Sequence, residues 1–485
     1  MLYWLTRRVH PSFVLVCLAV GVVLGVFLGV FWRAWWFSAP IWLVVVGVLV
    51  GICFLRCRWV VLLLAVIAGV ILGGWRTAGM VGDVGYIESF VGQEVEVSGV
   101  VAEDLDVDGG NVKLRLDGLV FGGEVAVEGK LFVTMSTRVG GEIERSDRVV
   151  LVGKIGEGFG SFAGSMWRPK VVEVAKPEPP DVALRLRNGF SEGVREYISE
   201  PEVDLGLGYL LGMKRALPVD TAEMLRVVGL THIVVASGYN LSVLVRAARR
   251  VFGKISRFAA LLFGLLLVVS FVGVTGLTPS MVRAGLVAGL SLLVWYFGRK
   301  FHPVKLLGLV AAATLLYNPM YVMDLGWLLS FASFAGVMLL APIITAYFYG
   351  TEKKPNFIAQ VLVETLSAQI CCLPLLLYFF GSFSLVSVVA NMLVLPTIPF
   401  VMLSVFLTGV VAGWSLIAGL LGTVSEWVLW YHLQVVDIFG GMTEFLVSVP
   451  TENPLMFLIY VPIVGLAGYA WRKSGISLVA TNVVE

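Results

Sequence analysis

The stretch Gly229-Leu-Thr-His-Ile-Val-Val-Ala-Ser-Gly-Tyr-Asn240 places polar side chains inside a run that is otherwise apolar enough for a membrane interior. A His, Ser or Asn side chain in hydrocarbon costs free energy unless it has a partner. Such residues therefore face a bundle interior, a water-filled path or a bound solute. His232, Ser237 and Asn240 mark a candidate pathway through the membrane.

The composition of the whole chain indicates a polytopic helical membrane protein. Its 485 residues are 58% hydrophobic and 14% charged, whereas soluble domains have about 25% charged residues. The five cysteines fall in or beside apolar runs, which does not indicate a disulfide framework. The net charge of +2 says little about partners, because the distribution of charge along the chain decides topology.

Residues 1–80 are predicted to form an N-terminal transmembrane region with three spans, near residues 13–31, 41–55 and 59–75. Most of the arginines beside these spans lie on one side of the membrane: Arg7, Arg8, Arg56 and Arg58. Arg33 alone lies on the other side. By the positive-inside rule the N-terminus is cytoplasmic, and three crossings deliver the next segment to the outer side.

Residues 83–176 show the alternating pattern of short β-strands. Strand-like runs occur near residues 95–100, 112–116, 125–128, 131–133, 149–152 and 171–174. Turn signals such as Asp108-Gly-Gly-Asn111 separate them. About five short strands predict a small inserted extracytoplasmic β-barrel of OB-fold-like type, with a generic β-sandwich as the alternative.

An OB-fold suits single-stranded nucleic acid, but the charge of this segment opposes general phosphate binding. Residues 83–176 hold ten Lys and Arg against sixteen Asp and Glu, a balance of −6. Contact with DNA here needs a local basic patch. The candidates for it are Arg138, Arg145, Arg148 and Lys154.

After a proline-rich linker and an amphipathic helix at 177–204, the apolar pattern returns. Residues 205–450 form the predicted transmembrane core, and residues 451–485 a final span with a cytoplasmic tail. Spans are predicted near residues 229–245, 258–275, 279–297, 304–318, 325–347, 357–380, 384–398, 401–422 and 455–471. Basic clusters after alternate spans, such as Arg246, Arg249 and Arg250, place these loops and the C-terminus in the cytoplasm.

Between Glu364 and Glu426 the chain has no charged side chain, and it contains Asn391, Pro396 and Pro399. A pair of short helices broken at proline is predicted here. In a membrane the freed backbone groups of such a break are tolerated where they line a cavity or meet protein partners. An ordinary hairpin kinked at proline is the alternative.

Four ordered motifs resemble those of the ComEC family of competence proteins, inner-membrane channels for DNA internalisation in natural transformation. The first is Gly229 to Asn240, similar to the family's Gly-Leu-x-His…Ser-Gly-Leu-His pattern, and the second is Thr275-Gly-Leu-Thr-Pro-Ser280-Met-Val-Arg283-Ala284. The third joins Asn318-Pro319, Asp324-Leu-Gly-Trp327 and Leu329-Ser330-Phe331, and the fourth joins 374–381 to Asn391-Met-Leu-Val-Leu-Pro396. The resemblance covers residues 180–450.

The resemblance has three departures. Asn240 stands where the family often has a second His, and Leu328 stands where it often has Gln, so a proton-relay or metal role at these positions loses support. Many members continue into a metallo-β-lactamase-like domain, but this sequence has no His-x-His-x-Asp-His run. We therefore expect no nuclease activity from this chain, no cofactor and no metal. We also expect no ATPase activity, because the sequence has no Gly-x-x-x-x-Gly-Lys-Ser/Thr loop.

Arg283 is the most informative charge, because it lies early in a predicted span after Pro279-Ser280. It either contacts phosphate at a pore, where a guanidinium holds two oxygens at once, or reaches the nearby interface. Carboxylates beside a DNA path would repel phosphate, so Glu364 and Gln369 are expected to be structural partners of Arg283 or His232, and Asp324 is also expected to be a structural polar group. A nucleophile formed by Ser237 and His232 is disfavoured, because five residues along one helix places them about 140° apart.

The sequence thus predicts a passive inner-membrane channel that conducts single-stranded DNA into the cytoplasm. The predicted path residues are His232, Ser237, Asn240, Ser280, Arg283, Ser330 and Asn391. Expected partners are the membrane, a DNA-receptor protein, a cytoplasmic helicase motor and a separate nuclease. The alternative function is a transporter of another polar or lipid-linked solute, with a membrane enzyme as the third.

Overall fold

The computed structural model describes residues 11–32, 42, 45–49, 59–108, 110–141, 143–213, 217–234, 237–299, 302–351, 355–442 and 445–476. Most of the predicted span at 41–55, and the arginines on which the N-terminal topology rests, lie outside these residues. The chain divides into two compact units. One comprises residues 1–180 and 304–328, and the other comprises 181–303 and 329–485.

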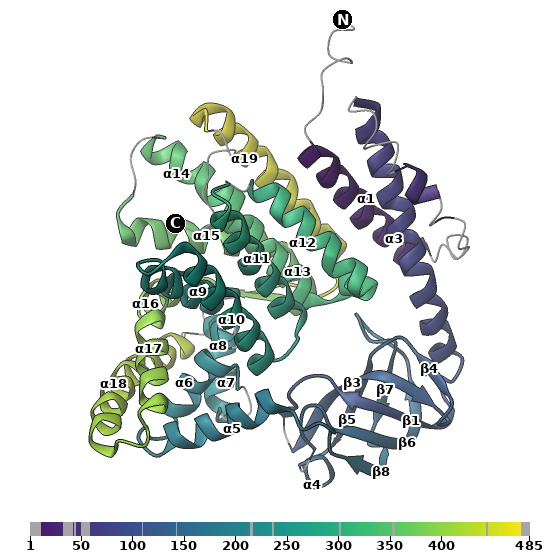
Figure 1. The fold of residues 1–485 in the computed structure, drawn as a ribbon, viewed down its shortest axis with the longest axis horizontal. Coiled ribbons are helices and arrows are strands. Elements are labelled where there is room, and N and C mark those ends of the chain that lie inside the picture. The colour runs from purple at the N-terminus through teal and green to yellow at the C-terminus, as the bar shows by residue number, and fades with distance from the viewer. Residues whose placement is uncertain are drawn as a thin grey trace, which may run out of the picture. The chain divides into compact units, whose positions relative to one another are not determined.

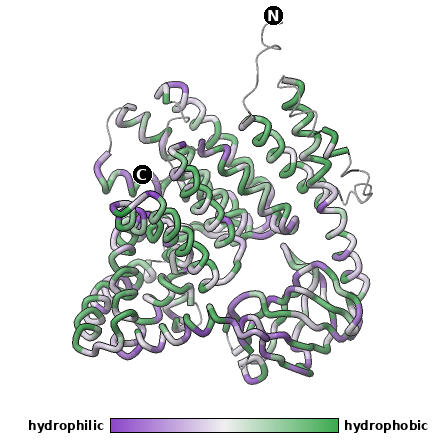
Figure 2. Tube along the Cα trace, viewed as in Figure 1, coloured by the Kyte–Doolittle hydropathy of each residue, from purple (hydrophilic) through white to green (hydrophobic). Residues whose placement is uncertain are grey.

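The two N-terminal helices pack through glycine. In α1 (Pro11–Trp32), Gly21 and Gly25 are four residues apart, and α3 (Trp59–Glu88) has Gly69 and Gly73 at the same spacing. A Cβ at Gly21 would lie 2.2 Å from the carbonyl oxygen of Val66, and a Cβ at Gly69 would lie 2.2 Å from that of Leu18. The helix backbones are therefore in direct contact, as in small-residue transmembrane pairs. Figure 2 shows α1 and the first part of α3 as mostly hydrophobic.

The helix α3 is longer than predicted, so the first strand of the barrel starts later in the sequence than predicted. The last predicted span ends near residue 75, but α3 continues to Glu88, and the first strand begins only at Glu94. Ile87, near the end of α3, is fully buried among the hydrophobic side chains of the barrel. Residues 83–88 therefore belong to a helix that anchors the barrel, not to a strand.

The β-domain is a closed five-stranded barrel (Figure 1). Its strands are β1 (Glu94–Val101), β3 (Asn111–Phe121), β5 (Leu131–Ser136), β6 (Arg148–Gly156) and β7 (Gly164–Trp167). They pair in the order β1-β3-β5-β7-β6, and β6 pairs with β1 to close the ring. The β5–β7 pair is parallel and the other pairs in the ring are antiparallel. Closure excludes the alternative of an open β-sandwich.

Shorter elements complete this domain. The strands β2 (Asp106–Asp108) and β4 (Val125–Val127) pair with β3, β8 (Lys170–Ala175) pairs with β6, and the short helix α4 (Thr137–Gly140) joins β5 to β6. All six predicted strand runs are present, while β2 and β7 were not predicted. Along β3 the side chains of Val112, Leu114 and Leu116 are completely buried, as the alternation of a half-buried strand requires.

The same unit contains a segment from the transmembrane half of the sequence. It comprises α12 (Pro303–Tyr317) from Val304 onward and a 3₁₀ helix, η4 (Pro319–Met323). The Oγ of Ser161 in the β6–β7 loop donates to the carboxylate of Asp324 over 3.2 Å, and the Nζ of Lys130 lies 5.5 Å above the ring of Tyr321. The barrel thus packs against residues that follow it in sequence by more than a hundred positions.

The second unit is helical. Before its spans lie α5 (Val182–Arg195), which confirms the predicted amphipathic helix, α6 (Glu202–Leu211) and α7 (Val219–Val228). The transmembrane helices that follow are α10 (Arg257–Thr275), α11 (Pro279–Tyr296), α13 (Leu325–Ala335) joined by a π-helical turn to α14 (Ala341–Tyr349), α15 (Phe357–Phe380), α18 (Ser415–Gly440) and α19 (Tyr460–Ser474). Eight helices of the described residues are long and apolar enough to cross a membrane, and the chain is a polytopic helical membrane protein with an inserted barrel.

Two predicted spans differ from the structure. The one near 229–245 is divided into α8 (Thr231–Val234) and α9 (Gly238–Phe252), and α9 has an exposed basic face that includes Arg246. The one near 401–422 ends at Val410, and the next helix, α18, was not predicted because Glu426 and Asp437 interrupt its apolar pattern. The predicted broken pair is present: α16 (Ser387–Val394) and α17 (Ile398–Val410) meet at an angle of 49°.

Candidate functional site

Arg283 is a buried cation of the helical unit. It lies in the first turns of α11, whose start is set by the side chain of Thr278, which accepts from the backbone N–H of Met281. Only 6% of Arg283 is exposed, and its Nε donates to the Oγ of Ser330 over 2.6 Å. Within the described residues no carboxylate lies within ion-pair distance of this guanidinium.

Aromatic rings and a glycine complete the surroundings of Arg283. The ring centroids of Phe331 and Phe334 on α13 lie 5.8 and 5.2 Å from the guanidinium carbon, within range of cation–π attraction. On the side of α9, a Cβ at Gly238 would lie only 3.0 Å from Nη2. The absence of a side chain at Gly238 therefore makes room for the guanidinium. Arg283, Ser330, Phe331, Phe334 and Gly238 are called the arginine site below.

The other polar residues of the opening stretch lie in different places. Asn240 is completely buried and donates from Nδ2 to the carbonyl oxygen of Tyr209 over 2.8 Å, while the hydroxyl of Ser237 donates to the Oδ1 of Asn240 over 3.2 Å. His232 is exposed on the four-residue helix α8. Because α8 ends before α9 begins, His232 and Ser237 do not share one helix, and the angle predicted between them does not apply.

A second cluster joins α15 to the broken helix pair, and it is called the amide site below. The Nε2 of Gln369 donates to the Oγ of Ser387 over 3.1 Å, and the Nδ2 of Asn391 donates to the carbonyl oxygen of Ser387 over 2.8 Å. Asn391 is 2% exposed. The Oε1 of Gln369 and the Oδ1 of Asn391 are buried acceptors with no hydrogen-bond partner in the described structure. These two oxygens can accept from a bound group that carries N–H or O–H.

The predicted partnership of Glu364 and Gln369 with Arg283 or His232 is wrong. Glu364 accepts from Gln360, one turn earlier on α15, over 2.9 Å, and Gln369 donates to Ser387. Ser280 is within 3.3 Å of the hydroxyl of Thr278 at the start of α11, so it belongs to the helix cap. The arginine site thus contains two of the predicted path residues, Arg283 and Ser330, and the amide site contains Asn391.

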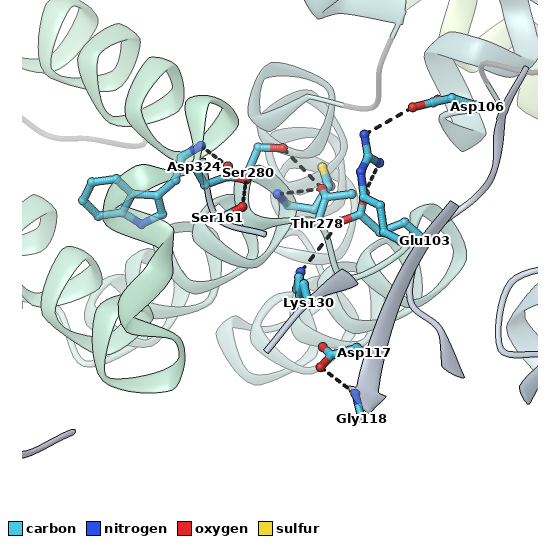
Figure 3. A network of polar contacts seen from close by, with 12 residues as sticks. Glu103, Asp106, Asp117, Gly118, Lys130, Ser161, Thr278, Ser280 and Asp324 are labelled. Carbon is cyan, nitrogen blue, oxygen red and sulfur yellow. Dashed lines mark hydrogen bonds and ion pairs between the residues drawn. The ribbon is translucent and has the colours of Figure 1, made fainter. Parts of the chain in front are cut away.

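Asp324 accepts hydrogen bonds from both a helix start and the barrel. Its Oδ1 accepts from the backbone N–H of Trp327 over 2.8 Å, which caps α13, and its Oδ2 accepts from Ser161 (Figure 3). Nearby on the barrel, Arg115 forms ion pairs with Glu103 at 2.6 Å and Asp106 at 3.2 Å. Burial lowers the pKa of Arg115, but these carboxylates outweigh burial, so its pKa lies above the ordinary value.

The predicted basic patch of the barrel is not one surface. Arg145 is buried, with 6% exposed, whereas Arg138 is exposed on α4. Arg148 and Lys154 lie at opposite ends of β6, about 20 Å apart at the rise of an extended strand. Of these four residues, Lys154 lines a pocket that also includes Trp167, Arg168 and Lys170. A sequence signal for that pocket was available, since Trp167-Arg168-Pro-Lys170 combines an aromatic ring with two cations in four residues.

The amide and arginine sites contain residues that sequence reasoning missed. Ser387 lies one helical turn before Asn391, a spacing that predicts one helix face, and Gly238 lies two residues before Asn240. Nothing in the local sequence indicates that Phe334 faces Arg283, because that contact depends on helix packing. Among the described residues, no group of three His, Cys, Asp or Glu side chains is arranged to hold a metal ion.

Comparison with known proteins assigns the chain to a family. A family model described as "Competence protein" matches residues 209–474, which is more than half of the 485 residues. ComE operon protein 3 of Bacillus subtilis (strain 168) is 28% identical over 265 residues, or 52% of this chain. The match covers 32% of that relative, so the chain spans about a third of its length. No solved structure matches. The chain belongs to the competence protein family.

Proposed function

We propose that this protein is a passive inner-membrane channel that conducts single-stranded DNA into the cytoplasm during natural transformation. The observation that carries the proposal is the arginine site. A buried guanidinium with no carboxylate partner is an uncompensated positive charge in a region of low dielectric. Such a charge is stabilised when an anion reaches it, and the phosphate groups of a passing strand supply that anion.

The geometry of Arg283 suits a phosphate. A guanidinium carries five N–H donors, and Ser330 accepts from Nε–H, which leaves the four N–H groups of Nη1 and Nη2. Those groups form the planar fork that binds two phosphate oxygens together. Ser330 holds the base of the fork, and the two phenylalanine rings hold its plane without adding negative charge.

Conduction requires that each site binds the strand weakly. The strand must bind well enough to enter and then dissociate toward the next contact, so a channel uses few contacts and no high-affinity site. The uncharged stretch between Glu364 and Glu426 agrees with this requirement, since it contains no fixed carboxylate to repel phosphate. We also propose that the strand contacts the segment of His232, Ser237 and Asn240. It then passes Ser280 and Asn391.

The orientation and the partners are also proposals. The basic residues on α9 and just after it, among them Arg246, Arg250 and Lys254, favour a cytoplasmic position for this segment, which agrees with cytoplasmic termini and an outer barrel. The sequence contains no Gly-x-x-x-x-Gly-Lys-Ser/Thr loop, so a helicase motor acts from another chain. A DNA receptor delivers the strand, and a separate nuclease removes its complement.

The test is uptake of fluorescent DNA by cells that carry Arg283→Ala. We expect loss of uptake and of transformants with normal amounts of membrane-inserted protein. Arg283→Lys should restore only part of the activity, because an ammonium does not form the bidentate fork. Arg257→Ala is the matched control, since Arg257 is an exposed arginine at the start of α10. Normal uptake in Arg283→Ala would refute the proposal.

A second candidate is transport of another polar or lipid-linked solute. The observation that favours it is the amide site, because the unpartnered oxygens of Gln369 and Asn391 accept hydrogen bonds and cannot bind phosphate oxygens. Broken helices of this kind form substrate sites in transporters. Asn391→Leu separates the two functions: it should abolish transport of a small solute that donates N–H or O–H, and reduce DNA uptake less than Arg283→Ala does.

A further inference from the structure

A pocket of about 530 Å³ opens on the barrel beside β6, β7 and β8. Its side chains include three cations, one carboxylate and one indole: Lys154, Arg168, Lys170, Glu94 and Trp167. Three of the ten basic residues of the segment 83–176 therefore line a single pocket. The local charge is positive although the segment as a whole has a balance of −6.

The carboxylate in the pocket offsets the charge of one of the three cations. Glu94 on β1 is the cross-strand neighbour of Lys154 on β6, so these two charges offset each other. The charges of Arg168 and Lys170 then remain for a ligand. Both flank Pro169 in the turn between β7 and β8, where they can contact neighbouring groups of an extended anion.

The indole of Trp167 has the surface for stacking. Its residue is 65% exposed at the end of β7, and the guanidinium carbon of Arg168 lies 5.8 Å from the ring centroid. Arg168 itself has a φ of +51°, in the left-handed region that non-glycine residues rarely adopt. Its backbone N–H donates to the carbonyl oxygen of Thr134 over 2.7 Å, which holds this conformation. Backbone conformations of this kind are concentrated at ligand-binding and active sites.

The ligand face of other five-stranded barrels of this kind is engaged here by the chain itself. Oligonucleotide-binding barrels use the face of their second and third strands together with the loop before the last strand. In this barrel that loop bonds Asp324 through Ser161, and Lys130 at the start of the third strand lies over Tyr321. The pocket beside β6 and β8 combines exposed cations with an exposed ring.

We propose that this pocket binds single-stranded DNA, with one base stacked on Trp167 and the flanking phosphates at Arg168 and Lys170. A stacked base with neighbouring phosphates matches an indole with neighbouring cations, and stacking tolerates any sequence. A lipid surface is the weaker alternative. The apolar part of α3 ends near Arg76, and the twelve further residues to Glu88 carry the barrel about 18 Å along the helix axis.

The test is binding of a fluorescent oligothymidylate of about 12 nucleotides to the full chain in detergent, followed by anisotropy. Trp167→Ala should weaken binding by about fivefold or more, and Trp167→Phe should retain most of the affinity. Arg168→Gly removes the guanidinium while favouring the observed backbone conformation, so the fold is preserved. It should lower the slope of log Kd against log salt by about 0.7.

Arg138→Gln is the matched control, because it removes an exposed cation of the same domain outside the pocket and should leave binding unchanged. This inference deepens the proposed function and rests on it for the choice of nucleic acid. All pocket variants keep Arg283, so failure of the pocket and failure of conduction are measured separately. Unchanged binding in Trp167→Ala and Arg168→Gly would overturn the inference. The inference would also be overturned if these variants lost binding to vesicles of anionic lipid but kept their binding to oligothymidylate. That result would assign the pocket to a membrane surface.

Discussion

Arg283 and Ser330 are 47 residues apart in sequence, and the Nε of one donates to the Oγ of the other over 2.6 Å. This bond joins α11 to α13 and fixes the direction in which the guanidinium fork points. The second and third sequence motifs, which contain Arg283 and Ser330, therefore contribute to one site although they lie far apart in the chain.

Ser330→Ala tests whether that bond orients the fork. The variant leaves Arg283 buried with one donor unmatched, and a hydrogen bond to a charged group contributes about 1.5–3 kcal/mol. We expect DNA uptake to fall about tenfold or more while the protein still inserts. Thr423→Ala, which removes an exposed hydroxyl bonded to the backbone of its own helix, α18, should have a smaller effect. Equal loss in the two variants would mean that Ser330 has no specific role.

Gly238→Ala tests the space beside Nη2. The added Cβ would lie 3.0 Å from this nitrogen, so the guanidinium must shift by several tenths of an ångström. We expect partial loss of uptake with unchanged thermal stability of the purified protein. Gly465→Ala, at a helical position where a Cβ meets nothing within 4 Å, is the control and should be neutral. Full activity in Gly238→Ala would show that the position of Nη2 does not matter.

The helix pair α1 and α3 gives a prediction about stability. Gly69→Val would force side-chain atoms into the backbone of Leu18, and overpacking of this kind costs about 1–3 kcal/mol. The melting temperature in detergent should fall. In contrast, Gly79→Val lies on the same helix at a position with nothing within 4 Å, so it should change stability by less than about 0.5 kcal/mol. Similar melting temperatures for both variants would contradict the observed packing.

The two oxygens of Asp324 give separable effects. Asp324→Ala removes the cap of α13 and the bond from Ser161, and loss of a cap alone costs about 1 kcal/mol. Ser161→Ala removes only the bond to the barrel loop and should cost less. Asp324→Asn retains a capping oxygen, so its melting temperature should lie near that of the wild-type protein. A larger loss in Ser161→Ala than in Asp324→Ala would show that the cap contributes nothing.

Much of the architecture could be predicted from the sequence, because its signals are local. The alternation along β3 and the break at Pro396 depend on neighbouring residues, and both are confirmed. The strand β7 was missed because Gly-Ser-Met-Trp contains no β-branched residue. The helix α18 was missed because Glu426 and Asp437 interrupt its apolar pattern, and because the burial of His432 beside the hydroxyl of Thr397 depends on helix packing.

The candidate site was predictable in part. Arg283 was identified because a cation inside an apolar helix is costly and therefore needs a reason. Its partners were not, since Glu364 was expected to approach it and Ser330, Gly238 and Phe334 do so instead. Which helix faces meet is decided by the packing of whole helices, and a pattern within one helix does not contain that information.

The most direct measurement is site-specific cross-linking of DNA during uptake. A photoreactive benzoylphenylalanine replaces Phe334, whose ring lies 5.2 Å from the guanidinium, and in a parallel protein it replaces Phe348 on α14, which is 73% exposed. Cells that take up labelled DNA are then irradiated, and the protein is recovered. We predict that the labelled strand becomes attached at position 334 and not at position 348. Attachment at neither position while uptake continues, or equal attachment at both, would contradict a path for DNA beside Arg283.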